Sequence, residues 1–112
     1  MAVQYVLYVS FPRDYAGFDM DKYPVMTFYE SVDLEIARVI EIWPDGHTGI
    51  ARLRDMLELG GAGVPDQLLP ENFLLNAVKD QFVREITQEQ FERYWRTAID
   101  RIKHELGVTV TD

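Results

Sequence analysis

The side chains of this chain that could do chemistry are two histidines and an excess of carboxylates. A hydrolase or transferase needs a nucleophile with a base, or two carboxyl groups in different environments. His47 follows a turn signal, and His104 lies near the end of the last predicted helix, where a positive charge is favourable. Neither histidine is framed by a catalytic motif, and the chain contains no cysteine. We therefore predict no catalytic residue and no enzymatic activity.

Two short patterns suggest bound ions but fail on inspection. Asp19 and Asp21 imitate the start of a calcium loop, yet Met20 and Lys22 stand where the pattern requires further oxygen ligands and a glycine. The glycine-rich residues 60–63 are not followed by the lysine and hydroxyl residue of a phosphate-binding loop. The sequence therefore predicts neither a metal site nor a cofactor.

The carboxylates indicate a partner instead. The chain has 19 acidic against 11 basic residues, a formal charge of −8, and most of the excess lies in the first 45 residues. Such a surface repels nucleic acid and bilayers and attracts basic proteins. Aromatic residues among these acids have the composition of an interface in which rings anchor and charges steer. The predicted interface is Tyr15, Phe18, Asp19, Asp21, Tyr23, Tyr29, Glu30, Asp33 and Glu35.

Two other interpretations of the charged residues exist, of which the first stays open and the second is set aside. The tyrosines of this set could equally be ordinary sheet residues, with the acids serving solubility. Arg93, Arg96, Arg101 and Lys103 are interleaved with acids, which is typical of a solvated helix face rather than a nucleic-acid patch.

The size and composition indicate one domain. A chain of 112 residues with 47% hydrophobic residues can bury a single core. We divide it into a sheet half, residues 1–59, and a helical half, residues 60–112. No segment reaches the length of an apolar membrane helix, and the N-terminal stretch lacks the pattern of a signal peptide. These features and the absence of cysteine favour the cytoplasm.

Strands are predicted from alternation, from residue types and from turn signals. Val3, Tyr5, Leu7 and Val9 recur at every second position. Residues 36–43 also fit a helical spacing, but they are rich in β-branched and aromatic types, and the turn signal Pro44-Asp45-Gly46 follows at once. The predicted strands are residues 2–11, 25–30, 36–43 and 48–54, with a loop over 12–23 and a brief extended piece at 82–86.

The last helix is the best-specified element. Thr87 is a good N-cap, Gln90 completes a capping box, and Gly107 supplies the C-terminal cap. Apolar residues then mark one face: Phe91, Trp95, Ala98, Ile99, Ile102 and Leu106. With a short helix over Pro70–Val78, the predicted fold is α+β, an antiparallel sheet of about four strands with the long C-terminal helix packed on one face.

A family likeness adds to this interpretation. The motifs are Arg38-x-x-Glu41-Ile42-x-x-Asp45-Gly46-x-x-Gly49-x-Ala51, then Pro70 and Asn76-Ala77, then Phe82-x-x-Glu85-Ile86-Thr87-x-Glu89-x-Phe91-Glu92-x-x-Trp95. Over the span from Tyr5 to Ala98 the chain resembles a family of small single-domain bacterial proteins, a domain of unknown function associated with polymorphic toxin systems and contact-dependent inhibition. The long loop after Pro12, the glycines after Leu59 and the extended last helix depart from it. The resemblance implies an immunity protein but carries over no functional residue.

The sequence as a whole therefore predicts a small acidic protein that binds and neutralises a cognate bacterial toxin, such as a nuclease. Carboxylates would meet a basic toxin site in place of phosphates. One alternative is a small carboxylate-based hydrolase, which two acids with separated titrations in a concave site would favour. Another is a self-associating structural or regulatory subunit, which an exposed apolar patch would favour.

Overall fold

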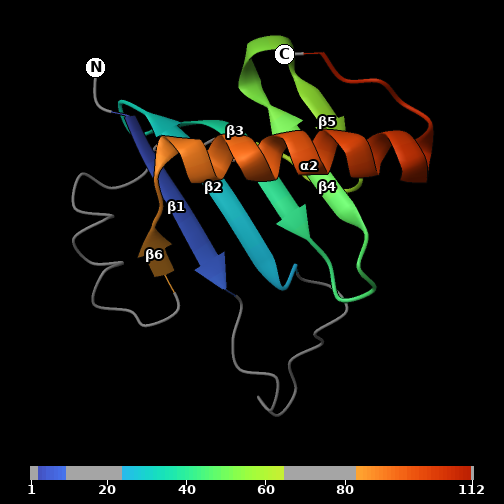
Figure 1. Cartoon of the computed structure of the whole chain (residues 1–112). Coiled ribbons are helices and arrows are strands. Elements are labelled where there is room, and N and C mark those ends of the chain that lie inside the picture. Colours follow the sequence, from blue (N-terminus) through green and yellow to red (C-terminus); the bar gives the residue numbers. More distant parts are fainter. Residues whose placement is uncertain (1–2, 10–23, 65–82, 112) are drawn as a thin grey trace.

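The computed structural model describes residues 3–9, 24–64 and 83–111. They form an α+β fold, an antiparallel sheet with the helix α2 laid across one of its faces (Figure 1). The predicted loop over residues 12–23 and the predicted helix over Pro70–Val78 lie outside the described residues. Within the described ranges, no helix combines the length and apolarity that crossing a membrane requires.

Within the described ranges the sheet has six strands, where the sequence predicted about four. Their order across the sheet is β5-β4-β3-β2-β1-β6, and each strand is antiparallel to its neighbours. The strands are β1 Val3–Val9, β2 Met26–Val32, β3 Glu35–Ile42, β4 Thr48–Arg52, β5 Leu57–Leu59 and β6 Val83–Glu85.

The two extra strands are the edges, and each has three residues. Alternation cannot be recognised over so short a run, so only the neighbouring strand defines them. The strand predicted to run to Arg54 ends at Arg52, where the 3-10 turn Leu53–Asp55 reverses the chain into β5. The extended piece predicted at 82–86 becomes β6 by pairing with β1.

Tight turns set the register of the central strands. Asp33 and Leu34 join β2 to β3, and both have positive φ, 51° and 72°. Positive φ at both central residues is the geometry of the two-residue turn that matches the twist of paired strands. The predicted turn at Pro44-Asp45-Gly46 is present between β3 and β4, where the Gly46 amide donates to the carbonyl of Trp43. A bulge at Glu30/Ser31 shifts the β2–β3 pairing by one residue.

The predicted helix is confirmed, with one exception on its apolar face. α2 covers Gln88–Leu106, Thr87 is its N-cap, and both hydrogen bonds of the capping box with Gln90 form. Gly107 ends it in the left-handed conformation with φ 69°. Of the predicted apolar face, Phe91, Trp95, Ala98 and Ile102 are buried, Ile99 is half-buried and Leu106 is 49% exposed.

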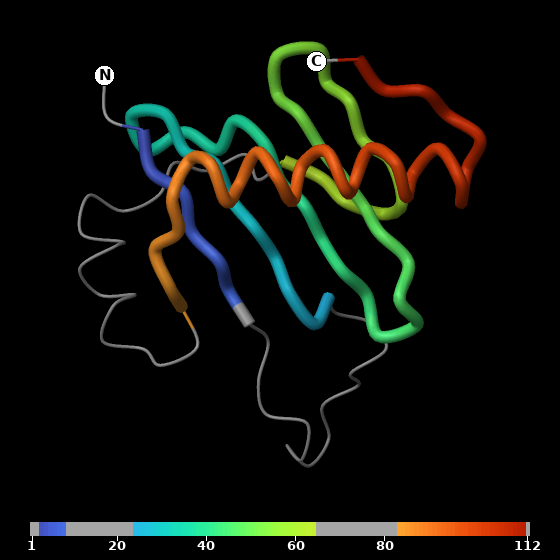
Figure 2. The backbone as a smooth tube through the Cα atoms, in the orientation of Figure 1, coloured from blue at the N-terminus to red at the C-terminus, as the bar shows by residue number. Residues whose placement is uncertain are grey.

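Apolar clusters lie on both faces of the sheet. The main cluster joins α2 to the sheet through Phe28, Ile40, Ile50 and Trp95. The chain after α2 turns back toward the β4–β5 end of the sheet (Figure 2), where Val110 joins the same cluster. On the opposite face a smaller cluster contains Ile36, Val39, Ala51 and Ala62. Side chains of one strand therefore enter two different environments according to their parity.

Candidate functional site

The predicted interface residues do not share one face of the sheet. Tyr29 and Glu30 are neighbours in β2, so their side chains point to opposite faces. Asp33 and Glu35 flank Leu34 at the β2–β3 turn and are exposed. The other five predicted residues lie outside the described residues: Tyr15, Phe18, Asp19, Asp21 and Tyr23.

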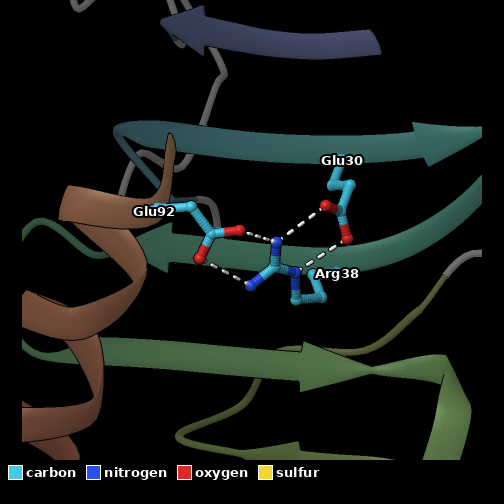
Figure 3. A network of polar contacts seen from close by, with 3 residues as sticks. All are labelled: Glu30, Arg38 and Glu92. Atoms are coloured by element: carbon cyan, nitrogen blue, oxygen red, sulfur yellow. Dashed lines mark hydrogen bonds and ion pairs between the residues drawn. The ribbon is translucent and has the colours of Figure 1, made fainter. Parts of the chain in front are cut away.

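Glu30 faces α2, where it belongs to a polar network centred on Arg38 (Figure 3). Arg38 donates from Nε and Nη2 to the two carboxylate oxygens of Glu30, with both distances 2.7 Å. Its Nη1 donates to Glu92 Oε2 at 3.2 Å, and its Nη2 donates to Glu92 Oε1. Glu30 comes from β2, Arg38 from β3 and Glu92 from α2. One guanidinium therefore joins two strands to the helix.

The Arg38 network is largely withdrawn from water. The side chains of Arg38, Glu30 and Glu92 are 14%, 12% and 29% exposed. The guanidinium carbon also lies 4.9 Å from the ring centre of Phe91 and 5.1 Å from that of Trp95, within reach of cation–π attraction. Burial works to lower the pKa of Arg38, but the hydrogen bonds and charges of the two glutamates outweigh it and raise this pKa overall. Arg38 is thus a permanent cation.

A second arginine is held in a similar way. Arg52 of β4 donates from Nε and Nη2 to Asp55 at 3.0 and 2.7 Å, and from Nη1 to the carbonyl oxygen of Thr111 at 2.8 Å. Its guanidinium carbon lies 6.0 Å from the ring centre of Trp95. The hydrogen bond from Arg52 lowers the pKa of the Asp55 carboxyl. Arg52 thereby fixes the returning C-terminal segment to the sheet.

The two arginines lie beside a groove of about 590 Å³. Glu30 and Glu92 line it from one side, and the turn after β4 adds Leu53 and Arg54. Arg54 is exposed, and within the described part of the chain it makes no hydrogen bond or ion pair. The groove therefore carries charges of both signs, and most of these charges are already matched within the protein.

Sequence reasoning placed Glu30 in a partner interface and gave Arg38 no role. A signal for the network was nevertheless present. Arg38 has the parity of Ile40 in β3, and Glu30 has the parity of Phe28 in β2, so both charges stand on the strand faces that carry core residues. Charged residues at such positions are almost never fully buried unless they are paired.

A separate half-buried cluster lies on the face opposite α2. Glu41 pairs with Thr27 across the β2–β3 ladder, next to Tyr29 and near Tyr8. Burial raises the pKa of Glu41. Burial also raises the pKa of Tyr29, and the nearby Glu41 and Tyr8 add to this rise. The cluster joins aromatic rings and a carboxyl group, as the predicted interface does, but Glu41 was not among its predicted residues.

His47 makes contacts that join parts of the fold. The Nδ1 atom of His47 lies 2.5 Å from Asp45 Oδ1, and its Nε2 atom lies 3.2 Å from the carbonyl oxygen of Gly60. The ring also stacks on Trp43 with centroids 5.5 Å apart. Hydrogen bonds from the backbone and side chain of His47 lower the pKa of Asp45. With both ring nitrogens engaged, His47 ties the β3–β4 turn to the chain after β5.

His104 is exposed in the last turn of α2. Over the described residues, no three histidine, aspartate or glutamate side chains gather in a way that could hold a metal ion.

Comparison with known proteins adds no relative. No protein-family model matches the chain, and neither curated proteins nor solved structures give a match. The resemblance to immunity proteins thus stays a prediction.

Proposed function

We propose that this chain is a protein-binding domain, an immunity protein that neutralises a basic toxin domain through exposed carboxylates. The observation that carries the proposal is the contrast between two sets of acids. Glu30 and Glu92 are turned inward onto Arg38, whereas Asp33 and Glu35 stand exposed on a tight turn at the end of the sheet. The inward acids position the elements, and the outward acids lie at the surface, where a partner can approach them.

The β2–β3 turn is suited to present charge. Its two-residue geometry holds Asp33 and Glu35 at the tip of a paired hairpin, so little conformational entropy is lost on binding. Val3, which is 43% exposed, pairs with Val32 beside this turn and offers an apolar contact. An apolar contact flanked by carboxylates is a combination that favours docking of a basic protein surface.

The Arg38 network supports binding over hydrolysis. A carboxyl pair acts in hydrolysis when one member donates a proton and the other accepts one or attacks. Here Glu30 and Glu92 each accept two hydrogen bonds from the same guanidinium, so the carboxylate oxygens of both are already engaged within the protein. These groups therefore suit a structural role, and a toxin inhibitor needs no reacting group.

The test is neutralisation of a neighbouring toxin. The chain is co-expressed with the toxin domain encoded next to it, and growth is scored. Purified proteins then give the association rate at low and high salt. Asp33→Asn/Glu35→Gln is expected to slow association several-fold at low salt, since steering by complementary charge raises association rates.

The matched control is Glu58→Gln/Asp100→Asn, which removes the same number of exposed carboxylates from β5 and α2. It should change the rate less, and the difference between the two variants should shrink at high salt. Failure of the chain to protect cells would refute the proposed function. Equal effects of the two variants would refute the assignment to the β2–β3 turn.

A further inference from the structure

A second groove lies on the flank of α2, and its lining residues take no part in the proposed partner binding at the β2–β3 turn. It has a volume of about 390 Å³ and lies between the helix and the β2–β3 strands. Its floor is apolar and includes Met26, Ile40 and Ile42. We call it the helix-flank groove, and its volume falls in the range of small-molecule sites.

The groove results from the choice of side chains on α2. Ala98 lies against the sheet between the larger Trp95 and Ile102, and its single methyl group does not fill the space that a longer side chain would take. Tyr94 also lines the groove, with its ring stacked on Phe28 at a centroid distance of 4.4 Å. Tyr94 is also 44% exposed, so an aromatic surface faces solvent beside the apolar floor.

The rim of the groove is basic although the protein is acidic. Arg93 and Arg101 line it together with the polar side chains of Gln90 and Thr97, and among the lining residues that the structure describes none is acidic. The two arginines are eight positions apart on one helix, which places them about 12 Å apart along its axis. Both are exposed.

The two arginines are also available for a ligand. Arg93 makes a long, exposed contact of 3.4 Å with Glu89, a type of ion pair that contributes little. The Arg101 guanidinium makes no hydrogen bond or ion pair within the described residues. Either guanidinium can therefore turn to an incoming anion at little cost.

We propose that the helix-flank groove binds a small amphipathic carboxylate, with its hydrocarbon body on the floor and its carboxylate at an arginine of the rim. Burial of an apolar chain supplies affinity at roughly 25 cal/mol per Å². The guanidinium supplies orientation, because its donors match the two oxygens of a carboxylate. The proposal is independent of toxin binding.

The experiment uses decanoate as the probe and the full chain labelled with ¹⁵N. Decanoate should shift amide signals near Met26, near Ile42 and along α2 from Gln90 to Arg101. Decanol and butanoate, which lack the charge and the long chain respectively, should bind more weakly. Arg93→Gln/Arg101→Gln should weaken decanoate binding about tenfold, the effect of losing one charge-assisted hydrogen bond.

The matched control is Arg96→Gln, because Arg96 is exposed on the same helix but does not line the groove. The affinity of this variant for decanoate should stay within about twofold of the parent value, a change too small for a lost charged contact. Shifts scattered over the whole surface, or decanol binding as tightly as decanoate, would overturn the proposal. So would ligand-free shifts of the groove signals that grow with protein concentration, since these would assign the groove to a second copy of the chain.

Discussion

Replacement of Arg38 by methionine tests whether one guanidinium holds α2 to the sheet. Methionine keeps an unbranched apolar side chain against Phe91 and Trp95 but leaves Glu30 and Glu92 without their cation. Removing one partner of a buried ion pair costs about 3–5 kcal/mol. Because the Glu92 side chain is 29% exposed and remains partly hydrated, we expect the lower end of this range, about 3 kcal/mol.

Urea unfolding at neutral pH, followed by the fluorescence of Trp43 and the buried Trp95, measures this loss. With an m-value of roughly 1–3 kcal/mol per molar urea, a loss of about 3 kcal/mol moves the midpoint down by about 1 M or more. The matched control is Arg93→Met on the same helix, whose ion pair with Glu89 joins side chains 74% and 84% exposed. Its expected loss is below about 1 kcal/mol.

A triple variant separates two causes of the lost stability: the loss of attraction between Arg38 and the two glutamates, and the burial of two carboxylates without a cation. Adding Glu30→Gln and Glu92→Gln to Arg38→Met removes both unpaired carboxylates, so part of the stability should return. The reasoning fails if Arg38→Met unfolds at the same midpoint as Arg93→Met. If the triple variant is less stable than Arg38→Met alone, the unpaired carboxylates are not the cause of the loss.

Two further predictions concern the rest of the sheet. Burial raises the pKa of Glu41, so protonation stabilises the fold at acidic pH, and this effect is lost as the pH rises through the raised pKa. Glu41→Gln should therefore have a higher urea midpoint than the parent at pH 7, with the two midpoints converging in acid; a gap independent of pH would contradict the assignment. Gly60 has φ +69°, and a Cβ there would lie 2.2 Å from the carbonyl oxygen of Thr48. Gly60→Ala should thus cost clearly more than the roughly 1–2 kcal/mol expected for Gly46→Ala, which has φ +89° but nothing within 4 Å, and equal midpoints would contradict this.

The sequence predicted the elements whose signals are local. The N-cap Thr87, its partner Gln90 and the terminal Gly107 lie within or beside α2, and all three form as expected. The central strands, whose signals are alternation in β1 and residue types with an adjoining turn in β3, are also present. The edge strands β5 and β6 have three residues each, too few to show a period.

The Arg38 network depends on contacts that no local pattern contains. Parity alone indicates that Glu30 and Arg38 face the core. Their pairing requires the register set by the turn at Asp33 and Leu34. The second carboxylate, Glu92, is 54 residues from Arg38 in the chain, so its position follows only from how α2 crosses the sheet. A sequence-based interface that includes both Tyr29 and Glu30 therefore joins side chains on opposite faces of β2.

The net charge of −8 describes the chain poorly at the distances where binding occurs. At physiological salt, charges interact over about 8 Å, so each surface feature responds to its nearest groups rather than to the total. The β2–β3 turn presents Asp33 and Glu35, whereas the described lining of the helix-flank groove presents Arg93 and Arg101 and no acid. These two surfaces favour ligands of opposite charge. The proposed basic partner at the turn and the proposed amphipathic carboxylate at the groove would therefore not compete for the same groups.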